Sequence, residues 1–131
     1  MWDGATATLT AANAGQVPPR WVHAADGAME TLTEAGPALG FVDEGEGLWP
    51  AYSITLAPGD CLCLMSDGLS AMMESGACAE LTDEAIRRVV VEHADRPLNE
   101  LAEAFDEHIA ACLARSPQQD DVTVVFLRRE K

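Results

Sequence analysis

Two acidic residues at the ends of apolar runs are the part of this sequence best suited to chemistry. Asp67 follows the apolar run 61–65, and Asp120 precedes the apolar run 122–127. If these runs form neighbouring antiparallel strands, the exit of one lies beside the entrance of the other, and the two carboxylates converge. Converging carboxylates repel each other unless a cation lies between them. The sequence therefore predicts a metal site at one end of a sheet.

The ligand atoms available at this predicted site are all oxygens. Without His or Cys, such a site favours Mg²⁺ or Mn²⁺ over zinc or copper. Asp121 is a supporting residue, and Gly68 would let the backbone approach a metal-bound water closely. An alternative stays open, because Ser66 and Asp67 are also typical of helix caps, and Asp120 and Asp121 of ordinary turns.

The composition limits the classes of function. The 131 residues are 48% hydrophobic, which fits one ordinary globular domain. Eight Lys and Arg against 22 Asp and Glu give a net charge of −14, which disfavours binding to nucleic acid or an anionic membrane. No apolar stretch reaches the roughly 20 residues of a membrane span. Because the four cysteines lack zinc-knuckle spacing and the N-terminus lacks a secretory signal, we interpret the cysteines as reduced and the protein as cytoplasmic.

The elements that must position the acids are β-strands in the first half and helices later. Short segments rich in Thr, Val and Trp, separated by Gly and Pro, predict strands. The predicted strands are 6–12, 20–23, 29–33, 52–56, 61–65 and 122–127, with 61–65 central because it is apolar on both faces. After Gly68 the apolar period changes to about 3.6 residues. This predicts a short helix near Leu69, a second helix after the N-cap Thr82, and a third over about 98–113.

Five segments, in this order along the chain, resemble the successive landmarks of one family. They are Asn13-Ala14-Gly15-Gln16-Val17-Pro18-Pro19, Gly36-Pro37-Ala38-Leu39-Gly40, Leu56-Ala57-Pro58-Gly59-Asp60, Leu64-Met65-Ser66-Asp67-Gly68-Leu69 and Asp120-Asp121-Val122-Thr123. The family is the PPM family of metal-dependent protein serine/threonine phosphatases, in the bacterial branch typified by SpoIIE and RsbU. The resemblance extends from about Thr6 to Arg129.

The resemblance implies an α+β fold, namely a partial PPM-type β-sandwich of mainly antiparallel strands flanked by two antiparallel helices. Residues 1–131 would form the C-terminal portion of a single phosphatase domain. Its centre would hold two Mg²⁺ or Mn²⁺ ions, with Asp67 and Asp120 as ligands and Gly68 and Asp121 in support. Gln16 stands where relatives carry His or Asp for an accessory metal, and a neutral amide is a poor substitute.

The activity implied by the resemblance is hydrolysis of phosphoserine or phosphothreonine by metal-activated water. The implied substrate is a phosphorylated regulatory protein, such as an anti-sigma-factor antagonist.

One departure from the family pattern limits this expectation. The bridging aspartate of the family lies in an Asp-x-x-Gly-His-Gly type element upstream of the Asn-Ala-Gly landmark, and this chain begins at Met1 just before that landmark. We therefore expect an incomplete site in this chain alone. Either a longer protein or gene supplies the first half, or the chain is a non-catalytic phosphatase-like binding module. In both cases we expect an apolar sheet face or edge to be left for the missing half, a dimer or a partner to cover.

Overall fold

A computed structural model of the chain describes residues 1–42, 47–74, 78, 81–115 and 120–131. The elements in chain order are β1 (Trp2–Asp3), β2 (Thr8–Ala12), β3 (Arg20–Val22), β4 (Met29–Thr31), β5 (Ala51–Thr55), β6 (Cys61–Met65), α1 (Asp67–Glu74), α2 (Asp83–Glu92), α3 (Leu98–Leu113) and β7 (Val124–Arg128).

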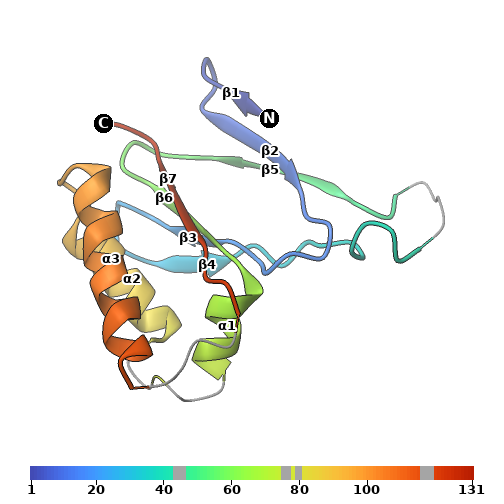
Figure 1. Cartoon of the computed structure of the whole chain (residues 1–131). Coiled ribbons are helices and arrows are strands. Elements are labelled where there is room, and N and C mark those ends of the chain that lie inside the picture. The colour runs from blue at the N-terminus through green and yellow to red at the C-terminus, as the bar shows by residue number, and fades with distance from the viewer. Residues whose placement is uncertain (43–46, 75–77, 79–80, 116–119) are drawn as a thin grey trace.

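The strands form two antiparallel sheets (Figure 1). One sheet has the order β1-β2-β5, and the other has the order β4-β3-β6-β7. The predicted α+β class is confirmed, and β6 has the predicted central position. The short helix predicted near Leu69 is α1, and the two helices predicted after it are α2 and α3.

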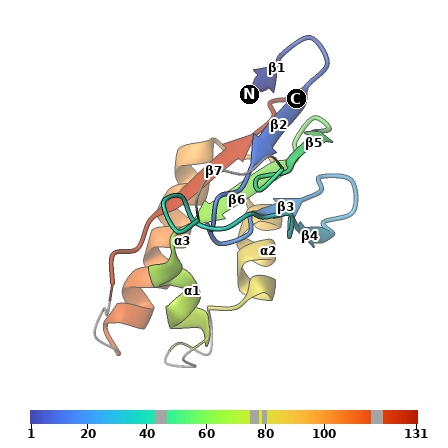
Figure 2. The same ribbon diagram turned by 90° about the vertical axis from the view of Figure 1, so that its right-hand side faces the viewer.

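The hydrophobic core lies between the four-stranded sheet and the helices (Figure 2). Successive side chains of a strand point to opposite faces, and Cys61, Cys63 and Met65 of β6 all belong to this core. Phe126 of β7 packs edge-to-face on Phe105 of α3, with ring centroids 5.3 Å apart. The side chains on one face of β6 and β7 thus pack against the helices.

The ends of the second helix are both anchored by side chains. Thr82 is the predicted N-cap of α2, and its hydroxyl accepts a 3.1 Å hydrogen bond from the Ala85 N–H. At the other end Arg128 donates to the carbonyls of His93, at 3.0 Å, and Arg96, at 2.6 Å. The Arg128 contacts tie the end of α2 to the last strand.

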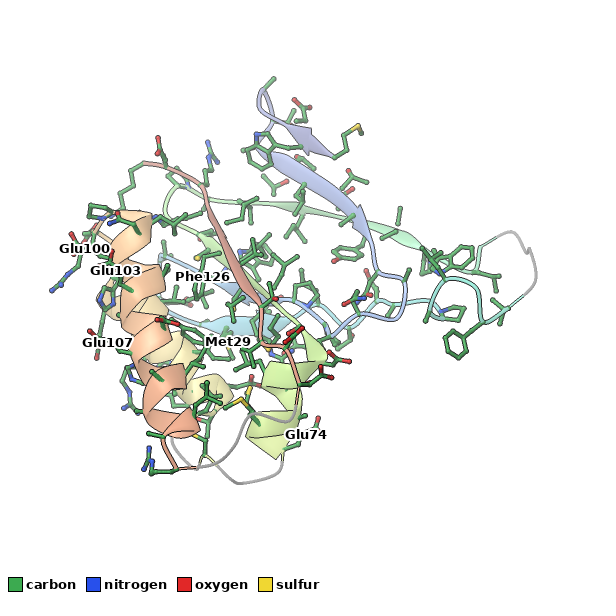
Figure 3. All side chains as sticks on the ribbon, viewed as in Figure 1. Met29, Glu74, Glu100, Glu103, Glu107 and Phe126 are labelled. Carbon is green, nitrogen blue, oxygen red and sulfur yellow. A yellow bond between two sulfur atoms is a disulfide. The ribbon has the colours of Figure 1, made fainter. Side chains whose placement is uncertain are left out.

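The third helix carries its charge on the side turned away from the sheet. Glu100, Glu103 and Glu107 lie along its outer surface (Figure 3). Its opposite face supplies Leu101 and Phe105 to the core, so the pattern is that of an ordinary amphipathic helix. No helix within the described ranges is both long and apolar enough to cross a membrane.

Two of the sequence landmarks pack on each other. Ala14 forms a parallel bridge with Gly36, and the Gly36 N–H donates to the Asn13 carbonyl at 2.8 Å. Gly15 has a φ of +78°, and a Cβ there would lie 2.8 Å from backbone atoms of Ala38. A left-handed backbone and this close approach both require glycine.

The expectation that all four cysteines are reduced is wrong for two of them. Cys78 and Cys112 form a disulfide, with Cα atoms 5.4 Å apart, whereas Cys61 and Cys63 are free. Cys112 lies on the buried face of α3, and Cys78 lies in the connection between α1 and α2. Tertiary packing brings them together, and the spacing of cysteines along the chain does not reveal such a contact.

Candidate metal centre

Asp67 and Asp120 lie at the same end of the four-stranded sheet. β6 and β7 are antiparallel neighbours, and their register ends with Met65 opposite Val124. Asp67 follows β6 as the first residue of α1, and Asp120 lies shortly before β7. The juxtaposition predicted from the two apolar runs is therefore what the strand pairing produces.

Beyond the last strand pair, Ser66 holds the two acidic segments, residues 66–68 and 120–123, together by hydrogen bonds. Its N–H donates to the Thr123 carbonyl at 2.9 Å, and its hydroxyl donates to the Asp121 carbonyl at 3.1 Å. The same hydroxyl accepts a 2.9 Å hydrogen bond from the Thr123 N–H. One serine thereby sets the position of both strand ends, which explains its place directly before Asp67.

Gly68 is needed for the contact between these segments. A Cβ at Gly68 would lie 2.3 Å from the carbonyl oxygen of Asp121 and 3.4 Å from the carbonyl carbon of Asp120. We expected the Gly68 backbone to lie close to a metal-bound water. In the structure it lies close to the backbone of Asp121. Any side chain at this position would push the two acidic segments apart.

Both candidate ligands are exposed carboxylates with a local hydrogen bond. Asp67 Oδ1 accepts from the Gly68 N–H at 3.0 Å, and Asp120 Oδ1 accepts from the Asp121 N–H at 2.8 Å. These bonds agree with the cap-and-turn interpretation. Asp67 also lies in the first turn of α1, where the positive end of the helix dipole stabilises a negative charge.

The chemistry of this donor set fits a hard cation, but the set is small. Carboxylate and carbonyl oxygens are the ligands that Mg²⁺ and Mn²⁺ prefer. Among the described residues, however, no group of three or more His, Cys, Asp or Glu side chains is placed to hold a metal ion. Within the described residues the predicted ligands are thus two carboxylates, Asp67 and Asp120, and their binding of a metal stays a prediction.

Gln16, the candidate for an accessory site, is held by its backbone. The Gln16 N–H donates to Asn13 Oδ1 at 2.8 Å, and the Gln16 carbonyl accepts from Asn13 Nδ2 at 2.9 Å. The Gln16 side chain is exposed. Its role as an accessory ligand stays a prediction.

One buried carboxylate was not identified from the sequence. Asp60 is 2% exposed and accepts hydrogen bonds from Trp21 Nε1 at 3.1 Å and from the N–H groups of Ala24 and Ala57, both at 2.9 Å. It joins β3 to the turn that starts β6, the strand that leads to Asp67. The signal available in the sequence is the Pro-Gly-Asp turn, which gives no indication of burial.

The chain is similar to a known family of proteins and to several solved structures. A family model described as stage II sporulation protein E (SpoIIE) matches residues 1–130. No curated protein matches the chain in sequence.

Three solved structures show the same fold. The RsbU and RsbW domains of Rv1364c from Mycobacterium tuberculosis are 24% identical, with a TM-score of 0.68 over 98% of this chain and 34% of that chain. The PP2C phosphatase domain with a regulatory fragment of SpoIIE from Bacillus subtilis is 21% identical, with a TM-score of 0.69 over 98% of this chain and 35% of that chain. The Mn-presoaked phosphatase domain of the same SpoIIE is 17% identical, with a TM-score of 0.60 over 99% of this chain and 54% of that chain. The chain thus spans about a third to a half of the length of these structures.

Proposed function

Because the chain belongs to the family of stage II sporulation protein E (SpoIIE), we propose that it forms part of a metal-dependent protein serine/threonine phosphatase. The observation that carries the proposal is the convergence of Asp67 and Asp120 at one end of β6 and β7, fastened through Ser66. Both aspartates stand at the positions that the family resemblance assigns to metal ligands.

The proposed cofactor is Mg²⁺ or Mn²⁺, two ions in a complete site. In this class of hydrolase, bound cations supply water activation and neutralisation of the phosphoryl charge. In that chemistry this chain would contribute the carboxylates of Asp67 and Asp120 as ligands. Gly68 and Asp121 keep the two segments that carry them in contact.

The proposed substrate is a phosphorylated regulatory protein of the cytoplasm, such as an anti-sigma-factor antagonist. Support comes from the family and from the acidic character of the chain, whose net charge of −14 disfavours anionic polymers as partners. The Mycobacterium tuberculosis protein with the same fold combines an RsbU domain with an RsbW domain.

A second candidate function is a non-catalytic, phosphatase-like binding module. It is favoured by the donor count, because the described residues include no group of three or more His, Cys, Asp or Glu side chains able to hold a metal. Two carboxylates bind one cation weakly and do not suffice for two.

Metal binding by the isolated chain distinguishes a partial phosphatase site from a non-catalytic binding module. We expect the isolated chain to bind Mn²⁺ weakly and Asp67→Asn to lower the Mn²⁺ affinity by about tenfold or more. The substitution removes a ligand, and the loss of a residue that only supports a ligand already lowers metal affinity by about that factor. We also expect little or no turnover of an aryl phosphate. The measurements are a Mn²⁺ titration followed by electron paramagnetic resonance and a phosphatase assay at saturating Mn²⁺.

Asp26→Asn is the matched control, because Asp26 is also exposed and accepts a local 2.9 Å hydrogen bond, from the Ala28 N–H. Equal Mn²⁺ affinity in the wild type and Asp67→Asn would remove Asp67 from the metal centre. Robust turnover abolished by Asp67→Asn would show that the isolated chain has a complete site.

The outer face of the four-stranded sheet is a proposed contact surface. Leu64, Val125 and Leu127 are 41%, 52% and 41% exposed, and Leu64 lies directly opposite Val125 in the register. β7 is also the last strand of its sheet. We propose that a second copy or the remainder of a phosphatase domain covers this face.

We expect the isolated chain to self-associate through this face. Val125→Lys with Leu127→Lys should weaken association about tenfold in sedimentation velocity, because buried charges oppose an apolar contact. Val91→Lys is the control, since Val91 is equally exposed, at 41%, but lies on α2. A wild-type monomer that binds no hydrophobic dye would contradict the proposal.

A further inference from the structure

The Cys78–Cys112 disulfide links the chain that follows Asp67 to the chain that precedes Asp120. Cys78 lies after α1, the helix that begins with Asp67. Cys112 lies in the last turn of α3, from which the chain continues to Asp120. The bond spans a sequence separation of 34 residues. A single covalent link therefore connects a residue that follows α1 with the last turn of α3.

The same two segments are held together at the strand end by hydrogen bonds alone. Ser66 bonds to Asp121 and Thr123 there, and this end is largely exposed to water. Exposed hydrogen bonds open readily in local fluctuations, whereas a disulfide limits the open states. The order of the candidate site therefore depends on both connections.

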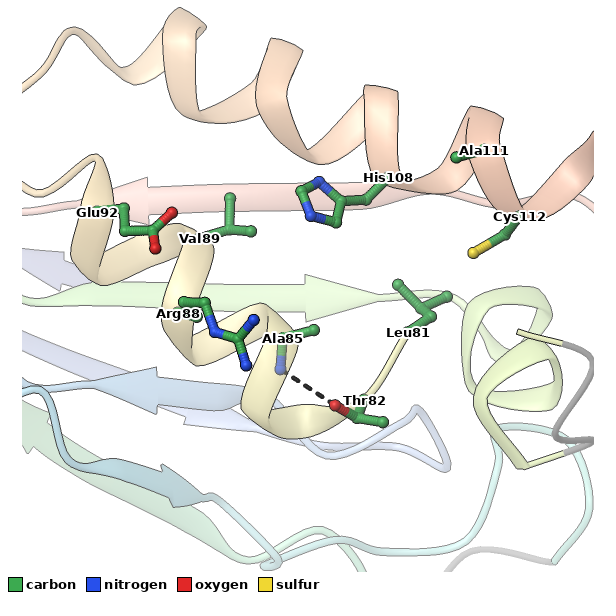
Figure 4. A pocket seen from close by; sticks show the side chains of 9 residues that line it. All are labelled: Leu81, Thr82, Ala85, Arg88, Val89, Glu92, His108, Ala111 and Cys112. Carbon is green, nitrogen blue, oxygen red and sulfur yellow. Dashed lines mark hydrogen bonds between the residues drawn. The ribbon is translucent and has the colours of Figure 1, made fainter. Parts of the chain in front are cut away.

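One cysteine of the disulfide, although only 2% exposed, borders an open groove. Cys112 lines a groove of about 400 Å³ between α2 and α3 (Figure 4). Leu81 and Val89 supply apolar walls, and the groove is also lined by the charged or polar side chains of Arg88, Glu92 and His108. The groove is wide enough for a small thiol, and the Arg88 cation favours the thiolate form that attacks a disulfide.

The two free cysteines are thiols of low reactivity. Cys61 and Cys63 are buried in β6. Desolvation by burial raises the pKa of the Cys61 thiol to about 11 and that of the Cys63 thiol to about 12. They remain protonated thiols at neutral pH, so thiol chemistry is confined to Cys78 and Cys112.

We propose that the Cys78–Cys112 bond is a redox-sensitive clamp on the segments carrying Asp67 and Asp120, and that it is opened by a small thiol entering the α2–α3 groove. The consequence for cation binding, and the cytoplasmic setting, rest on the proposed function. Disulfides that occur in a reducing cytosol are mostly transient or redox-sensing, which agrees with such a role.

The exchange proceeds in two balanced steps. A thiolate attacks Cys112 Sγ, the bond to Cys78 Sγ breaks, and Cys78 leaves as a thiolate that takes a proton from water. A second thiolate then attacks the external sulfur of the mixed disulfide and releases Cys112 as a thiolate, which takes a proton from water. Two small thiols are oxidised to their disulfide, and the protein disulfide is reduced by two electrons.

Amide hydrogen exchange of the whole chain, with and without dithiothreitol, tests the clamp. We expect reduction to speed exchange about tenfold or more in residues 67–74 and 120–123 and to leave β2 and β5 unchanged. Cys78→Ser with Cys112→Ser should show the fast pattern without reductant and no response to it. Mn²⁺ affinity should fall on reduction of the wild type.

Access through the groove has its own test. Ala111 lines the groove and its neighbour Ala110 does not, although both are exposed on α3. Ala111→Trp should slow reduction by dithiothreitol about tenfold, since thiol–disulfide exchange depends on access to the attacked sulfur. Ala110→Trp should leave the rate unchanged. Alkylation followed by mass spectrometry measures the rate.

Two results would overturn the clamp. One is four alkylatable thiols in protein unfolded without reductant, and the other is unchanged exchange at 67–74 and 120–123 after reduction. Faster exchange on reduction, combined with full Mn²⁺ affinity of Asp67→Asn, would support the clamp and count against the proposed metal centre.

Discussion

Replacement of Asp60 by alanine is expected to lower the free energy of unfolding by about 3–5 kcal/mol, the usual cost of removing one member of a buried polar network. The Asp60 carboxylate is 2% exposed and accepts from Trp21 Nε1 and from the N–H groups of Ala24 and Ala57. Alanine would leave all three donors without the acceptor that they share. Urea unfolding followed by Trp fluorescence measures the loss.

Asp3→Ala is the matched control. Asp3 also accepts a backbone and a side-chain hydrogen bond, from Ala5 and Thr6, but it is exposed. Water replaces the lost acceptor there, so we expect a much smaller loss of stability. Asp60→Asn should be intermediate, because one amide N–H would then face a donor. An Asp60→Ala protein within about 1 kcal/mol of the wild type would show that water reaches the three donors.

The position of Asp60 illustrates what the sequence did not reveal. Aspartate in a Pro-Gly-Asp turn is typical of an exposed loop. Its burial depends on the indole of Trp21, which belongs to a strand far away in sequence. The same reason applies to Cys78 and Cys112, whose pairing requires the packing of α3 against the α1–α2 connection. Local patterns carry no information on such contacts.

The convergence of Asp67 and Asp120 was predictable, because it needed one assumption about neighbouring strands. Two long apolar runs in a small sheet tend to pair, and antiparallel pairing puts the acids at one end. The apolar composition of β7 was less informative about its surroundings. Its Val124 and Phe126 pack against the core as expected, but Val125 is 52% exposed at the edge of the sheet. The composition of a strand indicates which of its faces can be buried. It does not indicate which part of the protein, if any, covers each face.

Gly68→Ala is expected to destabilise the protein by about 2–3 kcal/mol, at the upper part of the usual range for overpacking. Helix propensity alone predicts the opposite sign, because alanine in α1 would be favoured over glycine by up to about 1 kcal/mol. The deciding observation is the 2.3 Å distance from the added Cβ to the Asp121 carbonyl oxygen. A backbone atom held by Ser66 cannot move away without breaking the contacts that align the two acids.

The comparison with Gly4→Ala isolates this contact from the general effect of adding a methyl group. A Cβ at Gly4 would meet nothing closer than Trp2 Nε1 at 3.6 Å, so its free energy of unfolding should stay within about 0.5 kcal/mol of the wild type. Gly68→Ala should also weaken Mn²⁺ binding, because relief of the clash moves Asp121 and its neighbour Asp120 away from Asp67. A Gly68→Ala protein more stable than the wild type would mean that helix propensity outweighs the clash. The contact between the two acidic segments would then have no part in holding the site together.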